Sequence, residues 1–149
     1  LEIKSVESIL AIQDADAEAY RALQTLNKQT FLKSIANELT IQNKTLGIIN
    51  SDILVLDNLT PPPEAQTHLD LMIASLRTTQ SGLIKLSHGN TIIYEKLYAD
   101  LFSPGSIKEY PDTGEEMRQG RELIQKALNS WKQVGIEEDN LLSLLGIRR

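Results

Sequence analysis

The 149-residue sequence has no cysteine and only two histidines, and it contains no long apolar run. Without cysteine, the chain cannot form disulfides, thiolate nucleophiles or cysteine–metal centres. A zinc site takes three or four protein ligands, and two isolated histidines do not supply them. No stretch approaches the ~18 consecutive apolar residues of a membrane-spanning helix. We therefore expect no cofactor, no metal site and no membrane-spanning segment.

The chain also has fewer basic than acidic side chains. The chain has 20 acidic and 15 basic side chains, which gives a formal net charge of −5, and neither sign forms a continuous run. A polyanion is bound mainly through lysine and arginine contacts to its phosphates. We therefore expect no nucleic-acid partner.

Catalytic patterns are missing as well. Glu64 and His68 are four residues apart and could share a helix face as half of a metal site, but the chain has no second such pair. His88 stands alone beside Gly89 and Asn90, where a surface histidine is the commoner reading. No order of serine, histidine and aspartate indicates a triad. These absences predict that the protein is not an enzyme.

The chain lacks strand signals and is rich in helix formers, so the predicted fold class is all-α, in one domain over residues 1–149. Thr60-Pro61-Pro62-Pro63 must interrupt a helix, because each proline lacks an N–H and restricts the residue before it. The sequence therefore predicts a long antiparallel helical hairpin, with one arm over about 4–57 and the other over about 62–102. Residues 27–30 indicate either a kink or a slip in the apolar stripe, and we favour one continuous helix because no true breaker is present.

Two further helices are expected after a loop over about 103–114 that contains two prolines and two glycines. The third helix should run from about 114 to 134, with Gly135 as its C-terminal cap. A short last helix should cover about 138–145. Five of the seven aromatic residues lie beyond residue 89, and none lies between 32 and 89. This asymmetry predicts a three-helix body at one end and a thin two-helix arm at the proline end.

Both arms of the hairpin carry apolar residues at alternating steps of three and four, the spacing of packed antiparallel helices. Folding about residues 60 and 61 pairs positions whose numbers sum to 121 or 122. Leu46 then faces Leu76 and Ile49 faces Met72. Gln42 falls opposite Thr79, and this shared polar layer is expected to fix the register rather than to bind a ligand.

Seven apolar residues lie off the main stripes of the arm: Ile41, Ile48, Leu54, Val55, Leu71, Ile73 and Ile84. On a bare arm they would form a broad apolar surface, which monomers seldom expose. We therefore expect another surface to pack against these residues and bury them. A second copy of the chain, which would complete a four-helix bundle, ranks first. The alternatives are the C-terminal segment around 141–147 folding back, a different protein, or a bent hairpin that buries these residues itself.

A line of small residues, Ser75, Gly82 and Gly89, repeats every seven positions. Such a line can form a ligand groove, but it more often lets a neighbouring helix approach closely. We favour close packing.

The stretch Leu56-Asp57-Asn58-Leu59-Thr60-Pro61-Pro62-Pro63-Glu64, followed by His68 and Leu69, resembles a pattern of small bacterial extracytoplasmic helical proteins, including lipoproteins. The elongated body is also similar to that of the minor pilus components of type IV secretion systems. These resemblances imply a non-catalytic interaction or structural module outside the bacterial cytoplasm, or a minor pilus-type component of a secretion system. A bundle that senses a small molecule between its helices is the alternative, and the partner expected for the module is another protein or a second copy.

Overall fold

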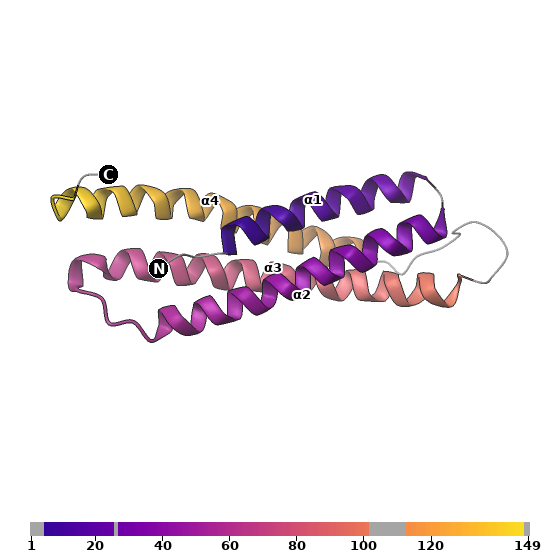
Figure 1. Cartoon of the computed structure of the whole chain (residues 1–149), viewed down its shortest axis with the longest axis horizontal. Helices are drawn as coiled ribbons and strands as arrows, with labels where there is room; N and C mark the ends of the chain where they lie inside the picture. Colours follow the sequence, from indigo (N-terminus) through magenta and orange to yellow (C-terminus); the bar gives the residue numbers. More distant parts are fainter. Residues whose placement is uncertain (1–4, 26, 102–112, 148–149) are drawn as a thin grey trace.

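The computed structural model describes residues 5–25, 27–101 and 113–147, and these form an elongated all-α structure (Figure 1). The described part contains no strand, which confirms the predicted fold class. A 3₁₀ turn at Pro63–Ala65 follows the interruption at the prolines. The described residues form four α-helices: α1 (Ser5–Gln24), α2 (Lys28–Asp57), α3 (Gln66–Ala99) and α4 (Gly114–Leu144). Residues 103–112 of the loop predicted over about 103–114 lie outside the described residues.

The prediction of one continuous helix from about 4 to 57 is wrong, because the chain reverses between α1 and α2 (Figure 1). The Asn27 side chain caps α2 by accepting a hydrogen bond from the Thr30 N–H at 3.0 Å. Thr25 Oγ1 donates to the Ala22 carbonyl at 2.7 Å. Short polar side chains thus supply local hydrogen bonds that compete with helix continuation. The reversal also lets α1 bury its apolar face against α2, which a continuous helix would leave in water.

The predicted separate helix over 138–145 is also absent, because α4 continues through Gly135 to Leu144. A glycine inside a helix costs about 1 kcal/mol relative to alanine, which burial of neighbours such as Val134 can offset. The helix ends instead at Gly146, whose φ of 70° lies in the left-handed region that favours glycine. The Gly146 N–H donates to the Ser143 carbonyl at 3.1 Å, and the Ile147 N–H donates to the Leu142 carbonyl at 2.9 Å.

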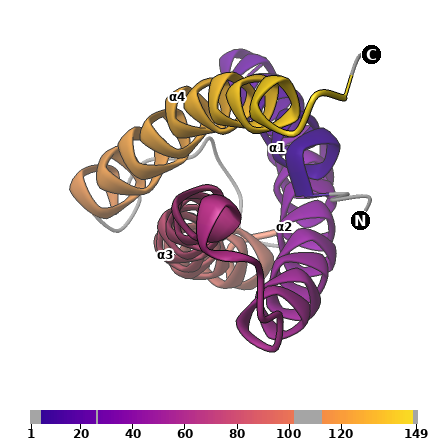
Figure 2. The same ribbon diagram turned by 90° about the vertical axis from the view of Figure 1, so that its left-hand side faces the viewer.

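The continuous α4 reaches the proline end of the molecule, so the prediction of a thin two-helix arm is wrong. Trp131 packs against the same core cluster as Leu56 and Leu69, which flank the proline segment. Seen end-on, the order around the long axis is α4, α3, α2, α1 (Figure 2). One chain therefore supplies four packed helices without a second copy. A second cluster, around Phe31, Ile35 and Leu97, fills the opposite end.

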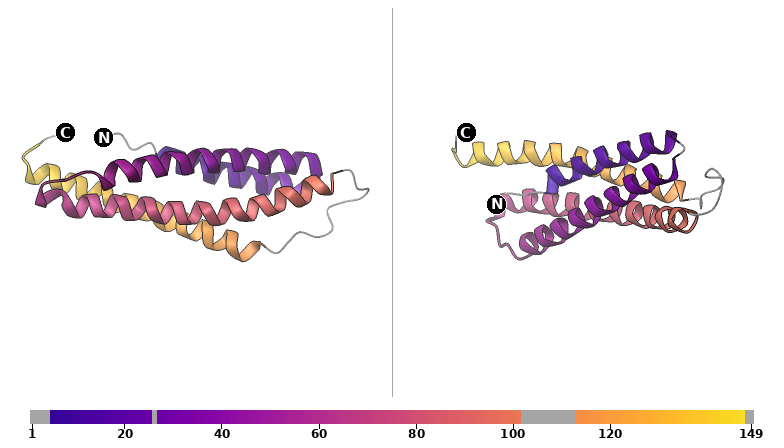
Figure 3. Two further views of the ribbon diagram at one scale, coloured as in Figure 1. Left: turned by 90° about the horizontal axis from the view of Figure 1, so that it is seen from below. Right: turned by 45° about the vertical axis from the view of Figure 1, so that its right-hand side comes forward.

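Helices α2 and α3 run alongside each other (Figure 3), but their register differs from the predicted one. The Gln80 amide donates to Asn50 Oδ1 at 2.7 Å, whereas the predicted neighbour of Asn50 lies near Met72. The Arg77 guanidinium bonds both carboxylate oxygens of Asp57 at 3.0 and 3.3 Å. Figure 1 shows why the pairing is displaced: α3 begins beyond the end of α2, so the connecting segment runs along the axis rather than straight across.

Close packing of α3 and α4 bears out the interpretation of the small-residue line. A Cβ placed on Gly82 would lie 2.8 Å from the Gly120 carbonyl oxygen, and a Cβ on Gly120 would lie 2.8 Å from that of Gly82. The two backbones therefore touch at this point. Gly89 similarly makes room for the Met117 side chain.

Candidate functional site

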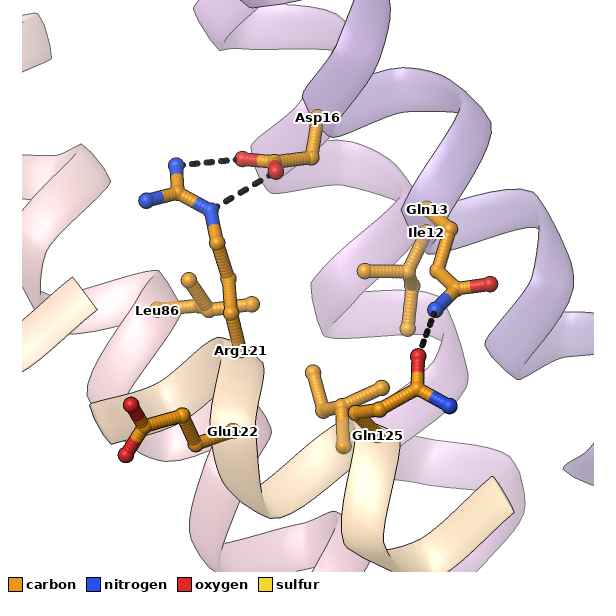
Figure 4. A pocket seen from close by; sticks show the side chains of 8 residues that line it. Ile12, Gln13, Asp16, Leu86, Arg121, Glu122 and Gln125 are labelled. Carbon is orange, nitrogen blue, oxygen red and sulfur yellow. Dashed lines mark hydrogen bonds and ion pairs between the residues drawn. The ribbon is translucent and has the colours of Figure 1, made fainter. Parts of the chain in front are cut away.

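The helices α1 and α4 contact each other at only a few residues, and two cavities lie along the resulting groove. The larger, which we call the outer cavity, has a volume of about 360 Å³ (Figure 4). The smaller, which we call the carboxyl cavity, has a volume of about 210 Å³. The outer cavity is lined by Ile12, Gln13, Asp16, Leu86, Arg121, Glu122, Ile124 and Gln125.

A bidentate ion pair between Asp16 of α1 and Arg121 of α4 lies on the wall shared by the two cavities (Figure 4). Arg121 Nε donates to Asp16 Oδ2 at 2.7 Å and Nη2 donates to Oδ1 at 2.6 Å. The hydrogen bonds to Asp16 raise the pKa of Arg121. Arginine is in any case charged at physiological pH. Gln13 Nε2 donates to Gln125 Oε1 at 3.4 Å nearby. The pair is the main polar connection across the groove between α1 and α4.

Glu38 of α2 lines the carboxyl cavity and is fully buried. Burial and, secondarily, the negative charge of Asp16 raise the pKa of Glu38 to about 7. The neighbouring Asn90 amide and the Arg121 charge oppose this shift without cancelling it. Gln42 Nε2 donates to Glu38 Oε1 at 2.8 Å. The side chains of Asp16 and Asn90 lie near Glu38, but Oε2 makes no hydrogen bond of good geometry to any described residue. One oxygen of this buried carboxyl group therefore lies beside the cavity without a hydrogen bond of good geometry.

Asn90 of α3 lines the same cavity and is also fully buried. Its amide lies near enough to Glu38 to favour the ionised carboxylate, yet neither Nδ2 nor Oδ1 makes a hydrogen bond of good geometry within the described part of the chain. Most buried polar side-chain atoms in proteins have a partner. Glu38 Oε2 and both amide atoms of Asn90 thus lack hydrogen bonds of good geometry within the described residues.

The rest of the carboxyl cavity is mainly apolar. Thr113 and Gly114 come from the start of α4, and Asp16 and Arg121 form one side. The hydrocarbon and aromatic wall comes from all four helices: Ala19, Tyr20, Leu23, Phe31, Ile35, Ile93 and Met117. An apolar cavity with a few convergent polar groups is the usual form of a small-molecule site.

A second hollow lies at the proline end, and we call it the proline-end groove. It has a volume of about 570 Å³ and lies between α4 and the segment that joins α2 to α3. His68 Nδ1 and Trp131 Nε1 are buried there, and neither has a hydrogen-bond partner among the described residues. The other lining residues are Leu56, Leu59, Pro61, Ala65, Leu69, Met72, Val134, Gly135 and Glu138.

The seven residues predicted to form an interaction surface are divided by the structure. Ile41 and Ile73 are half-buried against the main core, and Ile48 and Leu71 are also half-buried. Three stay exposed: Leu54 at 65%, Val55 at 45% and Ile84 at 55%. The chain itself therefore covers part of the predicted surface and leaves the rest open.

The predicted polar layer of Gln42 and Thr79 is buried at both positions. Each side chain bonds within its own helix, Gln42 to Glu38 and Thr79 Oγ1 to the Ser75 carbonyl at 2.9 Å. The displaced register of α2 and α3 argues against a direct Gln42–Thr79 pairing, and the shared layer stays a prediction.

The sequence pattern alone does not single out Glu38. The signal for Glu38 lies in its spacing, because the buried face of α2 steps by fours and threes through Phe31, Ile35, Glu38, Gln42, Thr45 and Ile49. Three successive positions on this face are polar. A polar run on a core face is a stronger indication of a site than either isolated histidine.

The histidines contribute no metal centre among the described residues, where no group of three potential ligand side chains occurs. His88 Nδ1 instead lies 2.8 Å from Glu116 Oε2, which links α3 to α4 at the surface. None of the helices, as far as they are described, is long and apolar enough to cross a membrane. Comparisons with family models, with curated proteins and with solved structures each gave no match.

Proposed function

We propose that this chain is a non-catalytic helical bundle that binds a small molecule in the carboxyl cavity. The observation that carries the proposal is Asn90, a fully buried amide beside that cavity whose Nδ2 and Oδ1 make no hydrogen bond of good geometry within the described residues, next to Oε2 of Glu38, which lacks one as well. The absence of catalytic patterns in the sequence favours binding without chemistry.

Energetic cost supports a functional reading of these groups. A buried polar group without a hydrogen bond costs about 1–3 kcal/mol, whereas leucine is close to asparagine in shape and would carry no such cost. Proteins keep locally unfavourable residues most often at functional sites. A ligand that satisfies Asn90 and Glu38 would recover the lost hydrogen bonds.

The surrounding helices suit a sensing role. The carboxyl cavity has walls from all four helices, while α1 is held to α4 mainly by Asp16 and Arg121. A ligand that fits one spacing of these helices better than another shifts the population toward that spacing. Binding would therefore be reported as a change in the position of α1.

Thermal unfolding with a panel of small metabolites tests the proposal. A ligand should raise the Tm of the wild type and of the control Asn37→Leu, which makes the same change at an exposed position of α2. Asn90→Leu should abolish the ligand-induced shift, while its ligand-free Tm should equal or exceed that of the wild type. Equal shifts in all three proteins, or no shift in the wild type with any compound, would contradict the proposal.

Protein interaction at the proline end is the second candidate function. Its support is the exposure of Leu54 and Val55 near the end of α2, together with Leu59 at 45% exposure. The resemblance of residues 56–64, His68 and Leu69 to small bacterial extracytoplasmic proteins favours a location outside the cytoplasm and a partner that is another protein or a second copy. The minor pilus-type role rests on overall shape, and fold alone does not imply function.

A further inference from the structure

We infer that the ligand of the carboxyl cavity is a small organic amine with an apolar body, bound as its ammonium cation against Glu38 and Asn90. The inference rests on the proposed function, because it names the ligand class of that same site. Three features of the cavity carry it: its charge balance, its free hydrogen-bonding atoms and its apolar wall.

Charge balance in the cavity favours a cation. The titratable side chains on its wall are Asp16, Tyr20, Glu38 and Arg121. Asp16 and Arg121 neutralise each other through their bidentate pair. Arg121 also attracts Glu38, but one guanidinium cannot neutralise two carboxylates, so the wall carries a net negative charge when Glu38 is ionised. A buried charge is strongly destabilising unless it is paired. A ligand ammonium would supply the missing positive charge, whereas an anionic ligand would be repelled.

Hydrogen bonding points the same way. An ammonium group has three donors and no acceptor. The atoms without a hydrogen bond of good geometry include two acceptors, Glu38 Oε2 and Asn90 Oδ1, from helices α2 and α3. A single ammonium could donate to both, and a hydrogen bond to a charged group contributes more than one between neutral groups. Gln42 already holds Glu38 Oε1, which fixes the carboxylate before a ligand arrives.

The apolar wall limits the body of the amine. Phe31 and Ile35 of α2 lie on one side, and Ile93 and Met117 come from α3 and α4. The volume of about 210 Å³ is below the ~300–1,000 Å³ typical of sites for drug-sized ligands. The body should therefore be a single aromatic ring or a short hydrocarbon chain.

Proton linkage follows from this arrangement. The pKa of Glu38 is about 7 because of burial and the Asp16 charge, so the carboxyl group is mostly neutral at pH 6 and mostly ionised at pH 8. Aliphatic amines are cations at both values, since their pKa is near ~10. Affinity for an amine should rise about tenfold from pH 6 to pH 8, while affinity for a neutral analogue should change little.

Isothermal titration calorimetry of the full chain with three probes of one shape tests the inference: 2-phenylethylamine, 2-phenylethanol and 3-phenylpropanoate. We expect the amine to bind most tightly, and about tenfold more tightly at pH 8 than at pH 6. Glu38→Gln should weaken amine binding at pH 8 at least tenfold and remove its pH dependence. Glu95→Gln, the same change at an exposed position of α3, should behave as the wild type.

Two results would overturn the inference. If the alcohol or the carboxylate binds as tightly as the amine, the cavity is still a ligand site but the amine assignment is wrong. If none of the three probes binds, the amine assignment also fails. The proposed function is tested separately, by thermal unfolding. It requires a compound that raises the Tm of the wild type but not that of Asn90→Leu.

Discussion

At the scale of single residues, Glu38 is the most unusual feature of the molecule. Acidic side chains are seldom fully buried without a charged partner. Glu38 has a neutral partner, Gln42, on its own helix, and its other oxygen lacks a hydrogen bond of good geometry. The residue therefore makes the folded state sensitive to pH in the neutral range.

Replacement of Glu38 by glutamine should remove a definite part of the pH dependence of stability. Since the pKa of Glu38 is raised from 4.5 to about 7 on folding, the folded protein binds more protons than the unfolded chain between these values. The free energy of unfolding should consequently fall as pH rises from about 4.5 to 7, by roughly 3 kcal/mol from this residue, and then level off.

Urea unfolding of the wild type and of Glu38→Gln at pH 5 and pH 8 measures this contribution. The stability of the wild type should drop more between the two pH values than that of the variant, because the other titrating groups are common to both proteins. An identical drop would show that the Glu38 carboxyl group is not buried as described.

At the scale of elements, α3 and α4 form the tightest pair, because two glycines bring their backbones into contact. By contrast, Gly47 of α2 is exposed, and a methyl group added there would have nothing within 4 Å beyond its own helix. Glycine inside a helix is unfavourable in itself, so its presence at Gly82 and Gly120 has to be explained by packing.

Alanine substitutions at Gly82 and Gly47 should have opposite effects on stability. Gly82→Ala forces a methyl group against the Gly120 carbonyl oxygen and should cost about 1–3 kcal/mol. Gly47→Ala should stabilise the protein by about 0.5–1 kcal/mol through helix propensity and a less flexible unfolded chain. Chemical denaturation of both variants checks the contrast, and stabilisation by Gly82→Ala would mean that α3 and α4 do not touch there.

At the scale of the whole molecule, several large apolar side chains stay exposed after the four helices have packed. Helices α1 and α4 complete the bundle within one chain and remove part of the need for a partner. Leu54, Val55 and Ile84 nevertheless stay exposed, as do Leu144 and Leu145 at the end of α4. Exposed apolar side chains that gather into a patch commonly mark interaction sites.

Self-association through the end of α2 predicts a dimer in light scattering at micromolar concentration. The double substitution Leu54→Ser and Val55→Ser should then give a monomer with unchanged helical circular dichroism, because both side chains are exposed in the single chain. Wild-type protein that is monomeric under these conditions would exclude a second copy as the partner that buries these side chains.

The sequence by itself determined the helical class, the interruption at Pro61–Pro63 and the close packing at Gly82, because each depends on local backbone chemistry or on heptad spacing. It placed Ile35, Leu39, Gln42 and Leu46 on one core-facing stripe of α2. In the structure Ile35 and Gln42 are buried while Leu39 and Leu46 are half-buried, because the packing of the other helices decides how deeply each position is covered.

Tertiary structure decided the rest. Thr25 and Asn27 permit a reversal without requiring one, and the burial of α1 against α2 selects it. That reversal brings Asp16 beside Arg121 and Glu38, three residues far apart in the chain. The carboxyl cavity could not be read from periodicity, because its polar corner exists only when α2 and α3 pack together and its remaining walls come from α1 and α4.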